Sequence, residues 1–300
     1  VAAARKAGLN IRKVKIMVSF YSEEPIRRYL EENNYFGFSP DEIIIYRQGK
    51  AERTVPGTGD LKDKYGEEAV ERLIAPKNFT QESWHLTVEN AKKYSGQGFV
   101  QVYAGLAQEK DFYNPPGHLD SIVGEGALKE LIQAYLEGEE IAFQSNIDNL
   151  FAEYGEIWLA ITGKLLSEDS DFVVMLDTEF DDRKGGQLLW LKENNQWKLH
   201  YFEASQLPKD FTMPEGQDVF AGPANFIYRI ERVLQKAYSL DITDKEALQT
   251  LLINETELRR LANKAKARFP KYFSLKEAKL AGKDKGVIAA KQFEQFYGDV

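Results

Sequence analysis

Residues 114–150 read NPPGHLDSIVGEGALKELIQAYLEGEEIAFQSNIDNL, and this stretch decides the fold class. It opens on a tight turn at 114–117, and apolar residues then recur at helical spacing over 127–136, on one face of a predicted helix. Gly138 stands where the end of a helix favours a residue that tolerates positive φ. Residues 141–149 then predict a short buried strand that runs into a polar loop. The order of turn, helix, strand and polar loop indicates an α/β sheet, in which ligands bind beyond the carboxyl ends of the strands.

The segments on either side extend the α/β pattern. Residues 14–18 and 43–46 predict strands, and residues 23–32 between them predict a helix, which together make the unit of a parallel sheet. Residues 61–95 predict a helical insertion outside the core, which we interpret as a solvated flap, with a lid over the site as the alternative. Further predictions are strands at 99–103 and 172–176, a hairpin at 187–202 around Asn194-Asn195, a helix after 225, and an amphipathic helical C-terminal segment with capping boxes at 243–246 and 274–277.

The composition excludes several classes of protein. The formal net charge of −8 argues against a nucleic-acid-binding protein, and the lack of cysteine excludes disulfides and thiolate chemistry. The sequence has no run of about 18 apolar residues and no signal peptide, so we expect no membrane partner and a cytoplasmic location. The chain does not begin with methionine, so we expect it to start inside a longer gene product. The sequence leaves the oligomeric state open.

Several motifs follow one another in a fixed order along the chain. They are NNYFG at 33–37 ahead of Gln48, PPGHLD at 115–120, SNIDNL at 145–150, RKGG at 183–186, and FEASQLP at 202–208. In this order the chain resembles the UDP-sugar pyrophosphorylase family, to which UTP–glucose-1-phosphate uridylyltransferase belongs. The resemblance runs from about residue 14 to the C-terminus, and the order and spacing of the motifs carry it.

The resemblance implies a fold and a reaction. The fold is a mixed, mostly parallel α/β sheet of the nucleotidyltransferase type, Rossmann-like or glycosyltransferase-A-like, forming one catalytic domain over residues 1–300. The reaction joins UTP and a sugar 1-phosphate, with glucose 1-phosphate expected, to give UDP-sugar and pyrophosphate, with Mg²⁺ as cofactor. Because negative charge builds on the phosphates, such a site needs cations and fixed donors more than a covalent nucleophile.

The resemblance also implies which residues contact the nucleotide and the metal. Gln48, Gly117, Asn146 and Asp148 would bind the nucleotide, with Gln48 at the uracil edge and Gly117 allowing a close approach of the backbone. Asp148 would supply the carboxylate for Mg²⁺, which takes one or two protein carboxylates and leaves the rest of its shell to phosphate and water. The alternative for Asp148 is a polar strand end that closes a turn.

A second group of residues would act on the sugar phosphate. His118 and Lys184 would be catalytic, and His118, Glu203 and Asn225 would contact the sugar phosphate. His118 could instead be structural, and Lys184 could be a solvated residue in a hairpin approach. Asp120 is left open between the site and an N-cap of the following helix.

The sequence departs from the family pattern in three respects. Leu119 replaces the second glycine of the PPGHGD turn, and the asparagine-rich loop is reduced to residues 222–225. We also expect the chain to lack the N-terminal glycine-rich loop and the C-terminal β-helix of the family, and so to be a fragment that folds but does not turn over substrate alone. Two alternatives follow: a non-catalytic module that binds nucleotide-sugars, and a glycosyltransferase. The second is disfavoured because Asn146 and Asn149, rather than a second acid, flank Asp148.

Overall fold

The computed structural model of the chain describes residues 13–145, 160, 163–164, 166–168, 171–174, 177–178, 186–202, 220–222, 226–281 and 286–295. The helices are α2 (Glu23–Glu32), α3 (Thr58–Tyr65), α4 (Glu67–Glu71), α5 (Gln81–Tyr94), α6 (Phe99–Tyr103), α7 (Asp120–Val123), α8 (Glu125–Leu136), α10 (Ile230–Tyr238), α11 (Lys245–Leu252) and α12 (Glu255–Lys266). The strands are β1 (Val14–Val18), β2 (Ile43–Arg47), β3 (Ala51–Glu52), β4 (Tyr113–Asn114), β5 (Ile141–Gln144), β6 (Phe172–Val174), β7 (Asp177–Thr178), β8 (Gly186–Glu193), β9 (Gln196–Phe202), β10 (Phe220–Gly222), β11 (Phe226–Arg229), β12 (Tyr272–Lys279) and β13 (Val287–Glu294).

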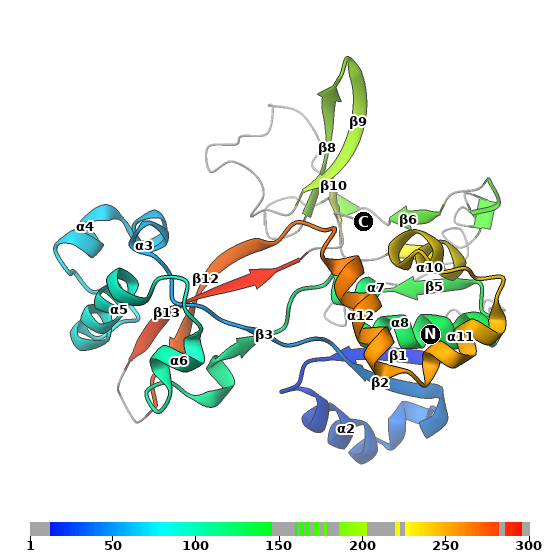
Figure 1. Cartoon of the computed structure of the whole chain (residues 1–300), viewed down its shortest axis with the longest axis horizontal. Helices are drawn as coiled ribbons and strands as arrows, with labels where there is room; N and C mark the ends of the chain where they lie inside the picture. The colour runs from blue at the N-terminus through cyan, green and yellow to red at the C-terminus, as the bar shows by residue number, and fades with distance from the viewer. Residues whose placement is uncertain are drawn as a thin grey trace.

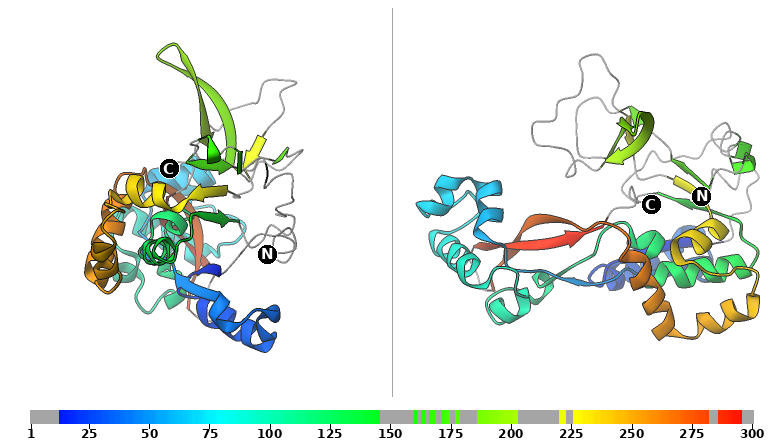
Figure 2. Two further views of the ribbon diagram at one scale, coloured as in Figure 1. Left: turned by 90° about the vertical axis from the view of Figure 1, so that its right-hand side faces the viewer. Right: turned by 45° about the horizontal axis from the view of Figure 1, so that its top comes forward.

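Most of the described elements gather into two parts (Figure 1). Helices α7, α8, α10, α11 and α12 form the α/β part together with β1, β2 and β5. Helices α3 to α6 form the helical part at the other end. The paired strands β12 and β13 run from the first part to the second, as both views of the orange and red ribbon show (Figures 1 and 2).

The first strand–helix–strand unit is confirmed. β1 and β2 pair in parallel from Val14–Ile43 to Val18–Arg47, and α2 connects them. The expectation of a mostly parallel sheet is not confirmed, because each other strand pair among the described residues is antiparallel. The described sheets are also small, with two to four strands each.

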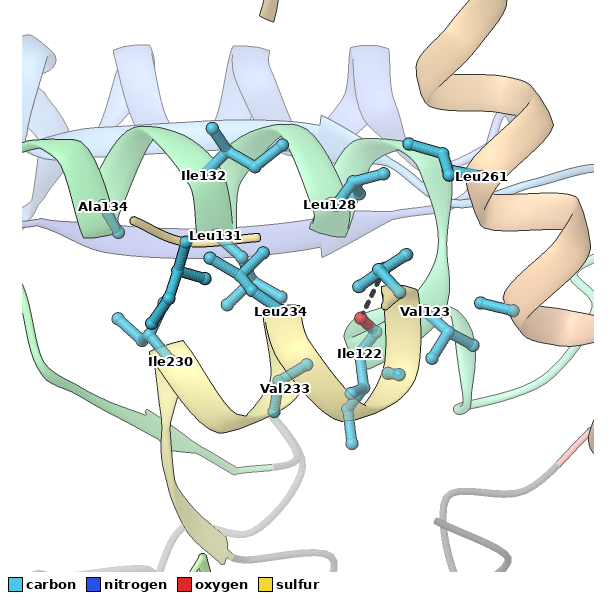
Figure 3. Close-up of a cluster of buried hydrophobic side chains, with 14 of the residues drawn as sticks. Ile122, Val123, Leu128, Leu131, Ile132, Ala134, Ile230, Val233, Leu234 and Leu261 are labelled. Atoms are coloured by element: carbon cyan, nitrogen blue, oxygen red, sulfur yellow. Dashed lines mark hydrogen bonds between the residues drawn. The ribbon is translucent and has the colours of Figure 1, made fainter. Parts of the chain in front are cut away.

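Helix α8 is confirmed, together with the buried face that its spacing predicts. Its buried residues share one core with residues of α10 and α12, and Figure 3 shows Leu131 of α8 facing Leu234 of α10. Gly138 follows with a φ of 83°, as the helix end requires. Burying this apolar face is the main source of stability for the α/β part.

Two predictions around the strands of this part need correction. Among the described strands β5 pairs with β11 alone, at the edge of its sheet, and Ile141 and Phe143 are 37% and 38% exposed instead of buried. The helix predicted after residue 225 begins only at Ile230, because residues 226–229 form β11 between β5 and β6. The predicted hairpin is confirmed as β8–β9, and Asn194 and Asn195 both have positive φ, as a two-residue type I′ turn requires.

The interpretation of residues 61–95 as a solvated flap is wrong. Helices α3, α4 and α5 form a core of their own around Leu61 and Trp84, each of which has no exposed surface. Leu275 of β12 and Ala289 of β13 complete this core. The segment is therefore helical, as predicted, but it packs against the C-terminal hairpin.

Three local predictions are wrong, because contacts between residues far apart in the sequence determine the secondary structure of these segments. Residues 99–103 form helix α6 instead of a strand, since Phe99 and Tyr103 are four residues apart and both fully buried on one face. The predicted C-terminal helix is real for α11 and α12, but residues 272–294 form the hairpin β12–β13. Ser274 therefore lies in a strand instead of a capping box, and Asp244 instead of Thr243 caps α11 through Ala247 N.

None of the helices in the described part of the chain has the length and apolar character that a membrane span requires.

Candidate functional site

A cavity of about 530 Å³ lies where the 114–118 turn meets the C-terminal hairpin. It draws its lining from segments that are far apart in the sequence, and three of the predicted site residues are among them. The lining residues are Gln48, Arg53, Asn114, Pro115, Gly117, His118, Lys276, Glu277, Gln292 and Glu294.

The turn is tied to the end of β13 by hydrogen bonds of the backbone. Gln295 N donates to Pro116 O at 2.8 Å, and Leu119 N donates to Gln295 O at 3.2 Å. A Cβ atom at Gly117 would lie 2.3 Å from Gln295 O, and the φ of Gly117 is 107°. Only glycine fits this position without strain, so its first role here is the close approach of two backbones.

Gln48 follows β2 and is held at the carboxyl end of the parallel pair. Its backbone N–H donates to Val18 O at 2.9 Å, which extends the β1–β2 ladder by one bond. The next residue, Gly49, donates its N–H to the carboxylate of Asp120, which is 2% exposed and also pairs with Lys266. The role of Asp120, which the sequence left open between the site and an N-cap, is therefore to fix the Gln48 loop: its carboxylate does not cap a helix in the described structure.

Leu119, which stands where the family pattern has glycine, does not reach the cavity. Its side chain is 1% exposed and belongs to the core around α8 and α10. The substitution therefore anchors the turn in the core.

Arg53 brings positive charge to the cavity. Its Nη1 donates to Asp111 O at 3.0 Å and lies 3.7 Å from Asp111 Oδ1, while its buried Nε has no hydrogen-bond partner among the described residues. Burial lowers the pKa of the Arg53 guanidinium, and the Asp111 carboxylate opposes this shift. A desolvated guanidinium with a donor to spare favours an anionic ligand such as phosphate.

The C-terminal hairpin supplies the remaining polar lining. Gln292 and Glu294 alternate with Phe293 along β13 and so share one face of the strand. Lys276 and Glu277 come from β12. Sequence reasoning missed these residues because the C-terminal segment was expected to be helical, and it missed Arg53 because this residue stands in no readable motif. The signal that could have found the hairpin is GKDKG at residues 282–286, a glycine-flanked turn sequence between two runs of strand length.

The other predicted site residues lie outside the described residues. They are Asn146, Asp148, Lys184, Glu203 and Asn225. In the described ranges no three His, Asp or Glu side chains gather closely enough to hold a metal ion. The metal role of Asp148 and the roles of its companions therefore stay predictions.

The family model of UTP–glucose-1-phosphate uridylyltransferase matches residues 97–221 of this chain. The matched region contains the 114–118 turn, α7, α8 and β5, whereas Gln48, Arg53 and the hairpin β12–β13 lie outside it. No curated protein matches the chain.

Solved structures of similar fold come from the same group of enzymes. A UDP-glucose phosphorylase from Trypanosoma brucei aligns with a TM-score of 0.61 and 15% identity, over 99% of this chain and 51% of that one. A mutant UDP-glucose pyrophosphorylase from Leishmania major in complex with UDP-glucose aligns with a TM-score of 0.53 and 16% identity, over 96% and 48%. A UDP-N-acetylglucosamine pyrophosphorylase from Entamoeba histolytica gives 0.49 and 15%, over 96% and 55%.

This chain thus spans about half the length of the solved structures that it matches. The likeness of the Trypanosoma brucei and Leishmania major structures supports the fold, and the match over residues 97–221 covers the PPGHLD, SNIDNL, RKGG and FEASQLP motifs. In the order of these motifs, in the match over residues 97–221 and in fold, the chain is similar to the UDP-sugar pyrophosphorylase family.

Proposed function

We propose that this chain carries the substrate site of a uridylyltransferase, which joins UTP and a sugar 1-phosphate to give UDP-sugar and pyrophosphate. The observation that carries the proposal is the cavity itself. It brings Gln48, Gly117 and His118 together from segments 70 residues apart, as the motif-based prediction requires, and it adds the cations Arg53 and Lys276. Glucose 1-phosphate is the sugar phosphate that we propose to test first.

The charge in the cavity suits the proposed reaction. An oxygen of the sugar 1-phosphate attacks the α-phosphorus of UTP in line, the bond from that phosphorus to the bridging oxygen breaks, and pyrophosphate leaves with the electron pair. Negative charge rises on the oxygens around the α-phosphorus in the transition state. Arg53 and Lys276 are placed at the cavity to offset this charge, which is the main catalytic contribution that such a site makes.

Mg²⁺ belongs to this proposal as a cofactor, with Asp148 as its carboxylate ligand. When bound, the ion would neutralise phosphate charge. Asn146, Lys184, Glu203 and Asn225 keep their proposed roles as contacts to nucleotide, phosphate and sugar.

The test is pyrophosphate release from UTP and glucose 1-phosphate, with Mg²⁺ present, by the full-length gene product, by its Lys276→Met variant and by the 300-residue chain. We expect release by the full-length protein alone and a fall of its kcat/KM by about 100-fold in Lys276→Met, since one donor to the developing charge is lost. Lys62→Met is the matched control, because Lys62 pairs with Glu67 and Glu71 on the surface of the helical part.

Three results would contradict the proposal in different ways. Equal rates for Lys276→Met and Lys62→Met would remove Lys276 from the reaction. Binding of UDP-glucose without pyrophosphate release would favour the non-catalytic binding module. Transfer of the sugar to an acceptor, again without pyrophosphate, would favour the glycosyltransferase.

A further inference from the structure

Two buried amide oxygens at the cavity have no hydrogen-bond partner in the described part of the chain. They are Asn114 Oδ1 and Gln292 Oε1, and the two side chains are 1% and 5% exposed. Both residues line the cavity. Because a buried polar atom without a partner costs about 1–3 kcal/mol, such a pair in a cavity indicates a ligand that supplies the missing partners.

The other hydrogen bonds of these two amides fix which atom is the oxygen. Asn114 Nδ2 donates to Pro115 O at 2.7 Å and to Phe293 O at 3.2 Å, and both of these partners accept only. Gln292 Nε2 donates to the carboxylate of Glu294. Turning either amide over would set oxygen against oxygen, so the two unpartnered atoms are acceptors.

The two acceptors belong to segments that are hydrogen-bonded to each other. Asn114 donates to the carbonyl of Phe293, the neighbour of Gln292 on β13. Ser274 stands directly across the hairpin from Gln292, and its buried Oγ likewise has no partner among the described residues. Two residues of the cavity lining, Asn114 and Gln292, therefore carry an oxygen without a partner, and Ser274 adds a third such oxygen next to Gln292.

The chemistry of these groups selects the class of ligand. The acceptors need hydrogen-bond donors, which a phosphate group at neutral pH hardly offers and of which a uracil ring offers one, N3–H. Glu277 and Glu294 add two carboxylates to the same lining. A sugar ring has several adjacent hydroxyl groups, each of which donates one hydrogen bond, and so it meets several acceptors at once.

We infer that Asn114 and Gln292 form an acceptor pair that binds hydroxyl groups of the sugar, and that this pair helps to determine which sugar the site takes. This inference rests on the proposed function and deepens it. Arg53 and Lys276 bind phosphate in the same cavity, so the sugar of a sugar phosphate lies beside the β13 face. Gln292 belongs to the hairpin, outside the segment that matches the family model.

The test measures the affinities of the 300-residue chain for UDP-glucose and for UDP by calorimetry, before and after Gln292→Met. Methionine keeps the length of the side chain and removes the acceptor. We expect Gln292→Met to weaken UDP-glucose binding by about tenfold, the value of one hydrogen bond, and to change UDP binding by less than about twofold. Gln101→Met, at an exposed position of α6, is the matched control and should change neither affinity.

A second measurement separates a hydrogen bond from a change of shape. Each monodeoxy analogue of UDP-glucose is tested on both proteins. The unchanged chain should bind one analogue about tenfold less tightly than UDP-glucose, and Gln292→Met should show no further loss for that same analogue, since the bond is already gone.

Equal weakening of UDP-glucose and UDP by Gln292→Met would overturn the inference and leave the proposed function standing, because the residue would then support the nucleotide or the fold. Unchanged affinity for UDP-glucose would overturn it as well. If the unchanged chain binds neither ligand, the proposed function and this inference fail together.

Discussion

The carboxylate of Asp120 connects three segments that are distant in the sequence. It accepts from Gly49 N, pairs with Lys266 of α12, and belongs to the turn that carries Gly117 and His118. A charge that is 2% exposed is tolerated only with such partners. Its burial therefore holds the Gln48 loop at a fixed position beside the turn.

Gly117 and Gly138 both have positive φ, yet their surroundings predict different costs for alanine. A Cβ at Gly117 would meet Gln295 O at 2.3 Å and Gln295 N at 2.7 Å, whereas Gly138 has open space around it. We expect Gly117→Ala to lower the free energy of unfolding by about 3 kcal/mol and Gly138→Ala by only about 1 kcal/mol. Urea denaturation followed by circular dichroism measures both. Equal losses would mean that backbone strain alone decides the cost and that the contact with Gln295 is unimportant.

The hairpin β12–β13 closes the core of the helical part on one face and lines the cavity on the other. Trp84 of α5 lies against Phe79 and Tyr65, with ring centroids 4.9 Å and 5.3 Å away, and shares its core with Leu275 and Ala289 of the hairpin. Packing in the helical part therefore supports the strands that carry Lys276 and Gln292.

Replacing Trp84 by alanine should consequently affect both stability and ligand binding. We expect Trp84→Ala to lower the free energy of unfolding by about 4 kcal/mol, the usual cost of truncating a buried aromatic residue, and to weaken UDP-glucose binding. Trp197→Ala is the control, since Trp197 of β9 is 65% exposed. Chemical denaturation and calorimetry measure the two effects. A Trp84→Ala protein as stable as the control would show that α5 does not support the hairpin.

Elements with a strong local pattern could be predicted from the sequence. The apolar spacing of α8, the asparagine pair between β8 and β9, and the strand–helix–strand unit β1–α2–β2 each depend on neighbouring residues. The hairpin β12–β13 could not be predicted. Ser274 and Glu277 have the spacing of a capping box, and only the pairing of β12 with β13 shows that the segment is a strand. Helix α6 is similar, since five residues with two buried aromatics suit either structure until their packing is known.

The same distinction applies to the candidate site, where some residues could be predicted from the sequence and others could not. Gln48, Gly117 and His118 were predicted because each belongs to a motif that is readable in the chain. Arg53 and Gln292 were missed, since neither stands in such a motif and the fold alone brings them to the cavity. The assignment of a sugar-binding role to Gln292 thus depends on its burial and on its missing partner, which no sequence pattern encodes.

Burial of tyrosine side chains throughout the protein predicts how it responds to alkali. Burial raises the pKa values of Tyr65 and Tyr103 to about 12, and it raises those of Tyr46, Tyr228 and Tyr238 further. In the unfolded chain a tyrosine ionises near pH 10. Because the pKa is higher in the folded state, the stabilisation that these groups give is complete below about pH 10 and is lost as the pH rises above it.

A spectrophotometric titration of the 15 tyrosines tests this prediction. In the folded protein, part of the absorbance change at 295 nm should occur only well above pH 10. This part should appear at the same pH as the loss of the far-ultraviolet circular dichroism signal. In urea the whole change should occur in one step at about pH 10. One step near that pH in the native protein, with its secondary structure intact, would show that these rings are open to solvent.

The span of β12 and β13 across both parts has a consequence for synthesis on the ribosome. Leu61 and Trp84 emerge about 200 residues before Leu275 and Ala289, which complete their core. During this interval the helical part presents an open apolar face, and such a face is what chaperones bind and what nascent chains aggregate through. The cavity cannot be complete before residue 295 has been synthesised, because Gln292 and Glu294 line it and Gln295 bonds to the 114–118 turn.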